Sequence, residues 1–309
     1  MARRGFRTFM VLLWLAAAAL AQPSAGAKAA PQPERKFMMW KVSSPAGTSP
    51  AGTAYLLGSI HLASSSIYPL PPAIEDAFAA SKTLVVEVDL KDLDRQRLTT
   101  EMMQAGMYAE GDGLSRHVPK GVLSALDDFC VRHGQLPRGA FERFRPWLAA
   151  LMVSIVPYME KGEDPNSGID MHFMNEAGPG QRIQELETAD FQLKLLSSFN
   201  DEEQVKSLDA ALHTSDEDAE KLERAYFAAD QPTLIRMIEE GNGLKSATRK
   251  LIYDRNPRMA DGVENCMKTA APCFVVVGAA HLIGEEGVVR ILQQRHYQVE
   301  SVDAVAAAR

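Results

Sequence analysis

Short apolar runs alternate with helical patterns along most of this 309-residue chain. Runs rich in β-branched residues and bounded by turn residues are typical of buried strands. They predict strands at 37–42, 53–57, 84–88, 182–186, 274–277 and 297–302. Between these runs, and above all from about 91 to 270, apolar positions recur with helical spacing instead. Strands alternating with helices predict an α/β fold, with a central mixed β-sheet and a large helical insertion at about 91–270.

Two of the predicted strands end in the same pattern. After each apolar run comes a glycine and, three positions later, a histidine: Gly58 precedes His61, and Gly278 precedes His281. A glycine lets the backbone turn tightly or approach another group closely. In open α/β sheets, sites form outside the carboxyl ends of the strands. We therefore expect both imidazoles in one site, although each histidine alone is equally consistent with a structural role at a strand end.

A third candidate is Glu87, which lies within the apolar run LVVEV at 84–88. A carboxylate inside a buried strand is costly unless it is paired, coordinated or protonated. Glu87 is therefore either neutralised by a buried arginine, for which Arg255 is the first candidate, or part of a functional site. Two histidines and a glutamate suit a divalent metal that activates water or polarises a carbonyl. The same groups could act as acid and base without a metal.

Three further polar residues have a simple structural interpretation. Glu187 ends a predicted strand, where its charge would favour the positive end of the next helix. Asn256 precedes Pro257 and is a good helix N-cap. Asp170 could begin the helix predicted at 169–177 in the same way. Each would also lie near the strand-end histidines if the sheet brings them together.

The N-terminus has the pattern of a secretory signal peptide. Three arginines precede an uncharged run at 8–21, and Ala19-Leu20-Ala21 offers a small-x-small cleavage site. The run is short for a membrane span, and an uncleaved membrane anchor is the alternative. Residues 22–36 are rich in Pro and Ala and predict a disordered linker, which leaves 37–309 as a single domain. We expect a secreted or periplasmic protein, typical of a Gram-negative-type bacterium.

Charge and cysteine usage narrow the possible partners. Without residues 1–21 the chain has 30 basic and 40 acidic side chains, a net charge of −10. An acidic chain without a basic block is a poor partner for nucleic acid or anionic lipid, so we expect a peptide or small-molecule substrate. Cys266 and Cys273 favour a disulfide in an exported protein. As thiolate metal ligands they would lack a partner at zinc spacing. Cys130 is predicted to be a buried free thiol.

Several well-marked enzyme classes are not supported, because their motifs do not occur in the sequence. There is no H-E-x-x-H, no P-loop G-x-x-x-x-G-K, no G-x-S-x-G and no G-x-G-x-x-G. The sequence therefore gives no support for a zincin, a P-loop NTPase or a serine hydrolase of these types.

The paired G-x-x-H strands and the strand glutamate resemble the TraB/PrgY/GumN family, especially its GumN-like bacterial branch, which is related to the Tiki proteases. The resemblance covers roughly 37–303 and rests on three segments: YLLGSIHL from position 55, LVVEVD from 84 and FVVVGAAHLIGEEGVVRILQQRHYQVE from 274. Weaker matches are GID at 168–170, LETADFQ at 186–192 and RNPRMA at 255–260. His296 replaces the glycine expected in the L-x-x-x-G-Y ending, a change that affects a turn and not the site.

This resemblance implies an α/β sheet with a helical insertion, akin to erythromycin esterase-like and ChaN-like proteins. It places His61, Glu87 and His281 at positions proposed as catalytic or metal-binding in Tiki-like members, which are metal-dependent peptidases. The expected cofactor is a divalent metal such as Mn, Co or Zn. Around this centre we expect Glu187, Arg255 and Asn256 as further catalytic groups and Gly58 and Gly278 beside the cofactor.

The sequence thus predicts an exported metal-dependent hydrolase, peptidase-like in its chemistry. One alternative is a protein of the same fold that holds haem or a metal without catalysis, as in the ChaN-like relatives. Another is a non-catalytic protein that sequesters a peptide.

Overall fold

The structure, a computed structural model, describes residues 34–49, 51–134, 137–241, 245–269 and 271–306. Its centre is a six-stranded mixed sheet with the strand order β5-β4-β6-β3-β2-β7. In that order the strands are Arg182–Glu185, Thr83–Val86, Cys273–Gly278, Thr53–Ser59, Met39–Ser43 and Gln298–Ser301. β1 (Arg35–Phe37) and β8 (Ala304–Ala306) form a separate antiparallel pair. The mixed sheet with many helices confirms the predicted α/β fold class.

Four neighbouring strands of the sheet run in the same direction. β3 pairs with β6, β6 with β4 and β4 with β5, all in parallel register, whereas β2 is antiparallel to both β3 and β7. Ser59 at the end of β3 is paired with Gly278 at the end of β6. Parallel neighbours share their carboxyl-terminal edge, so the residues that follow β3, β4, β5 and β6 all emerge at one edge of the sheet.

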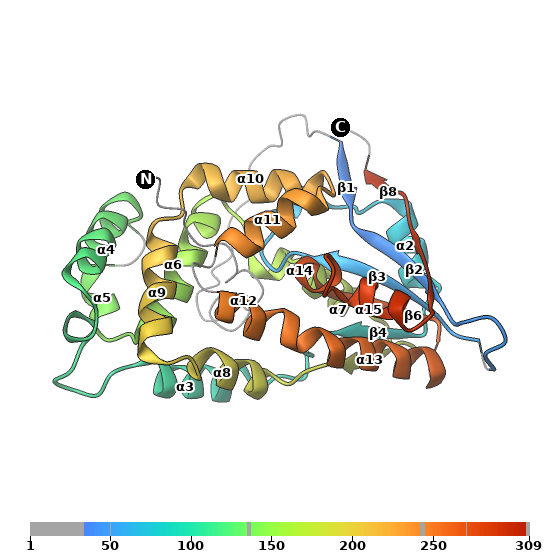
Figure 1. Cartoon of the computed structure of the whole chain (residues 1–309), viewed down its shortest axis with the longest axis horizontal. Helices are drawn as coiled ribbons and strands as arrows, with labels where there is room; N and C mark the ends of the chain where they lie inside the picture. Colours follow the sequence, from blue (N-terminus) through green and yellow to red (C-terminus); the bar gives the residue numbers. More distant parts are fainter. Residues whose placement is uncertain (1–33, 50, 135–136, 242–244, 270, 307–309) are drawn as a thin grey trace.

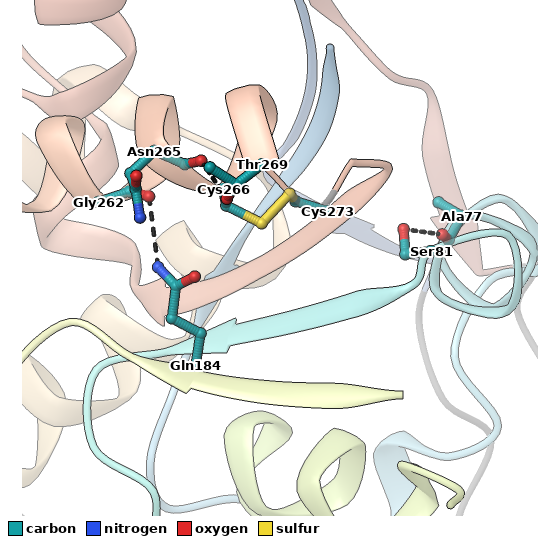
Figure 2. Close-up of a disulfide and its surroundings, with 8 residues drawn as sticks. All are labelled: Ala77, Ser81, Gln184, Gly262, Asn265, Cys266, Thr269 and Cys273. Atoms are coloured by element: carbon teal, nitrogen blue, oxygen red, sulfur yellow. Dashed lines mark hydrogen bonds between the residues drawn. A yellow bond between two sulfur atoms is a disulfide. The ribbon is translucent and has the colours of Figure 1, made fainter. Parts of the chain in front are cut away.

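The central strands are buried because helices cover both faces of the sheet. Phe274 of β6 packs against Phe78 of α2 (Pro72–Ala79) and Phe173 of α7 (Ile169–Glu176), with ring centroids 5.5 and 4.8 Å apart. Its neighbour Cys273 points to the opposite face, since side chains alternate along a strand. There it is joined by a disulfide to Cys266 of α13 (Asn256–Thr269), as Figure 2 shows. The predicted disulfide is confirmed, and it joins the central strand to its covering helix.

The remaining helices form most of the molecule outside the sheet. Figure 1 shows α4, α5, α6 and α9 gathered to one side of it. The residues of α6 are buried almost all round, as expected for a helix enclosed by others. Within the described residues, no helix combines the length and apolar character needed to cross a membrane. The helices not yet given are η2 (Ser65–Ile67), α3 (Arg95–Gly106), η3 (Leu114–Arg116), α4 (Lys120–Arg132), α5 (Arg138–Glu142), α6 (Pro146–Glu160), η4 (Pro165–Ser167), α8 (Ala189–Ser197), α9 (Asp201–Leu212), α10 (Asp216–Phe227), α11 (Gln231–Gly241), α12 (Lys245–Leu251), η5 (Tyr253–Arg255), α14 (Ala279–Leu282) and α15 (Val288–Gln294).

Some boundaries differ from the sequence prediction. The strand expected at 84–88 ends at Val86, so Glu87 is the first residue beyond β4 and not part of it. The strand expected at 37–42 is divided between β1 and β2, and β1 already begins at Arg35. Cys130 is a free cysteine, as predicted, but it is partly exposed. The predicted signal peptide at 1–21 and residues 22–33 of the predicted linker lie outside the described residues.

Candidate functional site

Four predicted site residues follow four neighbouring parallel strands. His61 lies two residues after β3, Glu87 directly after β4 and Glu187 two residues after β5, while His281 lies in the short helix α14 that continues from β6. All four side chains are buried. The common edge of the parallel strands therefore brings together residues as far apart in sequence as His61 and His281.

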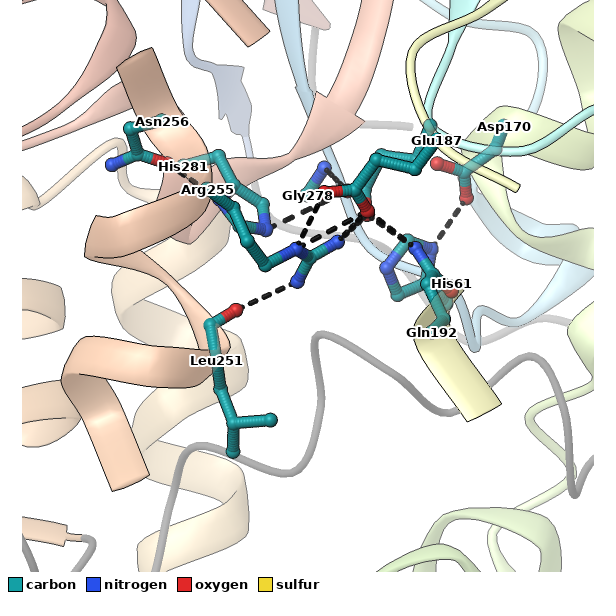
Figure 3. A network of polar contacts seen from close by, with 10 residues as sticks. His61, Asp170, Glu187, Gln192, Leu251, Arg255, Asn256, Gly278 and His281 are labelled. Atoms are coloured by element: carbon teal, nitrogen blue, oxygen red, sulfur yellow. Dashed lines mark hydrogen bonds and ion pairs between the residues drawn. The ribbon is translucent and has the colours of Figure 1, made fainter. Parts of the chain in front are cut away.

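Both imidazoles are oriented by a polar partner at Nδ1. His61 Nδ1 lies 2.9 Å from Asp170 Oδ2, and His281 Nδ1 lies 2.7 Å from Asn256 Oδ1. The amide nitrogen of Asn256 donates to the carbonyl oxygen of Glu286 at 2.7 Å, which leaves its Oδ1 to accept from His281. In each neutral ring the proton is then on Nδ1 and the lone pair on Nε2. Figure 3 shows the two pairs on opposite sides of the cluster.

Gly278 marks the point at which the two histidines and Glu87 meet. A Cβ atom at Gly278 would lie 3.2 Å from Glu87 Oε1, 3.5 Å from His61 Nε2 and 3.7 Å from His281 Cδ2. His281 Nε2 is 4.0 Å from Glu87 Oε1 and makes no hydrogen bond within the part of the chain that the structure describes. A methyl group at this position would press on Glu87 and contact both imidazoles, so the three side chains surround Gly278 closely.

Arg255 joins the two glutamates in a buried cluster. Its Nη2 lies 3.0 Å from Glu87 Oε2, and its Nε lies 2.9 Å from Glu187 Oε1. The amide nitrogen of Gln192 donates to both carboxylates, at 3.3 Å to Glu87 and 3.1 Å to Glu187. The other oxygen of Glu87, Oε1, accepts the backbone N–H of Gly278 at 2.7 Å. Glu87 is therefore held between Arg255 on one side and the meeting point at Gly278 on the other.

Burial shifts the pKa values of His281 and Glu87 in opposite directions. Burial lowers the pKa of His281 well below its usual value, and the positive charge of Arg255 acts in the same direction, as does that of His61 when its ring is protonated. Burial also raises the pKa of Glu87, although the Arg255 charge opposes this shift. His281 is consequently neutral with a lone pair on Nε2, and Glu87 is a stronger proton acceptor than an exposed glutamate.

The donor types at this point fit a divalent transition metal. Imidazole nitrogens and a carboxylate oxygen suit Zn, Co and Mn, and the buried Nε2 of His281 has no other hydrogen-bond partner among the described residues. Two ligands each about 2.1 Å from one ion lie at most about 4.2 Å apart, and the 4.0 Å between His281 Nε2 and Glu87 Oε1 satisfies this limit. As they stand, however, the described residues contain no group of three His, Cys, Asp or Glu side chains arranged as a metal site.

A cavity gives access to His61. It has a volume of about 280 Å³, and its walls include Ser59, His61 and Gly278 at the ends of β3 and β6. A second, much smaller cavity of about 20 Å³ is lined by Glu87, Asp170 and Gln192, and His61 borders both. His61 thus separates a space large enough for part of a substrate from the carboxylate cluster.

The structure changes the interpretation of several predicted residues. Asn256 is the first residue of α13 and its side chain contacts His281, so its role is not that of the predicted N-cap. Glu187 contacts Arg255, while Thr188 caps α8 as expected. Gly58 does not face the histidines. A Cβ there would lie 3.1 Å from the Cβ of Ala279, so Gly58 permits α14 to pack against β3.

Two residues of the cluster contact the predicted site residues directly, which the sequence alone did not indicate. Asp170 was expected at the start of a helix, yet its side chain contacts His61. Gln192, which contacts both glutamates, was not singled out at all. Asp170 lies in the weaker family segment GID and Gln192 in LETADFQ. This resemblance is the sequence feature that could have identified them as site residues.

The fold and this edge cluster define an α/β protein with two strand-end histidines and a glutamate at one buried point. The profile of the TraB/PrgY/gumN family matches residues 38–301, so the chain belongs to this family.

Three relatives match over most of the chain. An uncharacterized protein of Treponema pallidum (strain Nichols) is 23% identical, over 84% of this chain and 81% of that protein. The Metalloprotease TIKI2 of Danio rerio is 23% identical, over 87% of this chain and 61% of that protein. The Metalloprotease TIKI homolog of Nematostella vectensis is 22% identical, over 88% of this chain and 68% of that protein. The chain thus spans about three fifths of the Danio rerio protein, and no solved structure matches it.

Proposed function

We propose that this protein is a metal-assisted hydrolase of the peptidase type, with His61, Glu87 and His281 at its reactive centre. The observation that carries the proposal is their convergence on Gly278, where a Cβ atom would lie within 3.7 Å of all three side chains. The names of the Danio rerio and Nematostella vectensis relatives, both metalloproteases, support this type of chemistry.

In this proposal the two histidines hold a divalent cation through Nε2, with Glu87 as a further ligand or as the general base. When bound, the cation would polarise the carbonyl group of the substrate and lower the pKa of a water molecule. Glu87 would then be placed to accept a proton as the general base, a role that its raised pKa favours. Its Oε1 faces the meeting point, while its Oε2 is fixed by Arg255.

The surrounding residues act by positioning. Asp170 and Asn256 fix the two imidazole rings, as carboxylate and amide partners of metal-binding histidines commonly do. Glu187 and Gln192 complete the environment of Arg255, so that the positive charge stays beside Glu87. The substrate is a peptide or a small molecule with a hydrolysable carbonyl group, and the confirmed disulfide supports an exported location.

The test is elemental analysis of residues 22–309 after identical exposure to Mn, Co and Zn salts, beside His61→Ala, Glu87→Ala and His281→Ala. We expect about one equivalent of metal in the parent and its loss in all three folded variants. His117→Ala is the matched control, because His117 is an exposed histidine that pairs with Asp112 outside the site. A parent that binds no metal, or variants that all retain it, would contradict the proposed metal centre.

A binding protein without turnover is the second candidate, and the ion pair between Arg255 and Glu87 favours it. A carboxylate held by a guanidinium is a weaker base than its burial alone would make it. Stoichiometric metal or haem in a protein that cleaves no member of a diverse peptide mixture would support this candidate over the hydrolase.

A further inference from the structure

The cavity beside His61 has a buried end and an open end. The buried end is formed by His61, Ser59 and Gly278, all of which are buried. The open end includes Glu223, an exposed residue of α10. The rest of the lining is largely apolar and comes mainly from α10, α11 and the segment after α14: Leu222, Tyr226, Phe227, Leu234, Ile238 and Ile283. A ligand in this cavity would therefore contact apolar surface as well as His61.

The hydroxyl group of Ser59 favours a polar group of the ligand at the buried end of the cavity. Its side chain is only 3% exposed, and within the described residues its Oγ has no hydrogen-bond partner. A buried hydroxyl without a partner costs free energy that a bound polar group can recover. Because Ser59 lines the same wall as His61, a peptide N–H or C=O beside His61 is well placed to supply this partner.

Two acidic side chains, Glu163 and Glu223, line the cavity. Glu163 lies in the segment between α6 and η4, is half-buried, and makes no side-chain hydrogen bond or ion pair to the other described residues. Burial raises the pKa of Glu163 to about 8, and the charge of Glu223 adds to the shift. Glu163 therefore keeps its proton at neutral pH in the free protein, and a cation placed beside the two acids would favour the loss of that proton.

The nearby basic side chains are already engaged. The guanidinium of Arg35 lies 4.8 Å from the centre of the Phe227 ring and donates to the carbonyl oxygen of Ser66 at 3.0 Å. Lys161, the basic group that acts on Glu163, is paired with Glu220 at 3.3 Å. Arg35 also lines the cavity, where the charge of Glu223 acts on it. A cationic group of a ligand would therefore meet Glu163, whose basic neighbour is paired elsewhere, and Glu223, which it would share with Arg35.

We propose that this cavity is the subsite for a substrate residue with an apolar stem and a cationic end, recognised by Glu163 and Glu223. Lysine-like groups bury their methylene chain along apolar surface and keep the charged end at its polar limit, which fits a cavity lined by both apolar and acidic side chains. The cation is either a lysine or arginine side chain or the free amino terminus of a peptide. The inference rests on the proposed peptidase function for the identity of the ligand.

Direct binding tests this inference separately from hydrolysis. Dissociation constants are measured by calorimetry for three peptides: acetyl-Ala-Ala-Lys-Ala-Ala-amide, the same peptide with norleucine in place of lysine, and the norleucine peptide with a free amino terminus. We expect at least one cationic peptide to bind about ten-fold or more tightly than the acetylated norleucine peptide, as charge-assisted hydrogen bonds allow. The tighter of the two identifies the source of the cation.

Variants show whether the two acids carry this preference. Glu163→Gln and Glu223→Gln should each reduce it several-fold and leave binding of the acetylated norleucine peptide unchanged. Glu217→Gln removes the same charge from an exposed position of α10 that does not line the cavity, and it should have no effect. Equal binding of the three peptides, no binding of any, or a preference that survives both substitutions would overturn the inference. If the protein hydrolyses peptides but binds all three equally, the proposed function holds and the subsite is wrong. If it prefers a cationic peptide but hydrolyses none, the subsite holds and the proposed hydrolase function is wrong.

Discussion

The side chain of Asn256 fixes the orientation of His281. Its Oδ1 accepts from His281 Nδ1 at 2.7 Å, while its Nδ2 donates to the carbonyl oxygen of Glu286 at 2.7 Å. The second hydrogen bond prevents the amide from presenting a donor to the ring. His281 consequently directs its lone pair at Nε2 toward Glu87.

Replacement of Asn256 by alanine should weaken metal binding about 10- to 100-fold, the usual effect of losing a partner of a metal-ligating histidine. The measurement is a competition titration with a chromophoric chelator, with circular dichroism to confirm folding. Asn265→Ala is the control, because Asn265 is an exposed asparagine on the same helix. Unchanged affinity in a folded Asn256→Ala protein would show that the hydrogen bond to His281 does not support a metal centre.

Arg255 should contribute mainly to stability. Replacing it with methionine leaves Glu87 and Glu187 buried without their shared cation, and breaking a buried ion pair in this way costs about 3–5 kcal/mol. The free energy of unfolding in urea measures this loss. Adding Glu187→Gln to the variant should restore part of it, because one of the unpaired charges is then removed.

The matched control is Arg249→Met, since Arg249 is about half exposed and pairs with Asp254 and Glu286. An exposed ion pair contributes at most about 1 kcal/mol. Similar losses for the two arginine variants would contradict the interpretation of Arg255 as the cation of a buried cluster.

The apolar runs predicted the sheet well because they depend on local pattern alone. FVVV at 274–277 could be assigned to a buried strand, and the histidine after it to a strand end, without knowing any partner. Since parallel strands align their carboxyl ends, the meeting of His61 and His281 also followed from the fold class.

The supporting contacts could not be predicted in the same way, because they join positions distant in sequence. The local sequence at Asn256 suits a helix N-cap, and it contains nothing to show that the side chain instead contacts a histidine 25 positions away. The contact of Arg255 with Glu187 spans 68 positions and depends on how η5 is placed relative to the residues that follow β5. Only the family resemblance directed attention to these segments.

The disulfide should stabilise the folded state modestly. Cys266 and Cys273 are seven positions apart, and closing so short a loop is expected to contribute roughly 2 kcal/mol through the unfolded chain. The midpoint of urea unfolding should therefore fall in the presence of reductant. A Cys266→Ala, Cys273→Ala variant should lose this response, whereas Cys130→Ala should keep it. A parent midpoint that is the same with and without reductant would argue against a stabilising disulfide.

Glu163 should make stability depend on pH. Its pKa of about 8 in the folded protein lies above the ordinary value of 4.5, because of burial and the charge of Glu223. Between these values the folded state keeps a proton that the unfolded chain has lost. The resulting stabilisation is complete below about pH 4.5 and is lost as the pH rises through about 8.

Glu163→Gln removes this titration, so its stability relative to the parent should rise with pH. We expect a relative gain on the order of 2 kcal/mol between pH 5 and pH 9, since the partial exposure of Glu163 reduces the full effect of the shift. Urea unfolding of both proteins at pH 5, 7 and 9 measures the difference. Glu217→Gln, at an exposed position of α10, should differ from the parent by the same amount at every pH. A constant difference for Glu163→Gln as well would mean that Glu163 titrates normally, and the cavity would then hold a second ionised carboxylate at neutral pH.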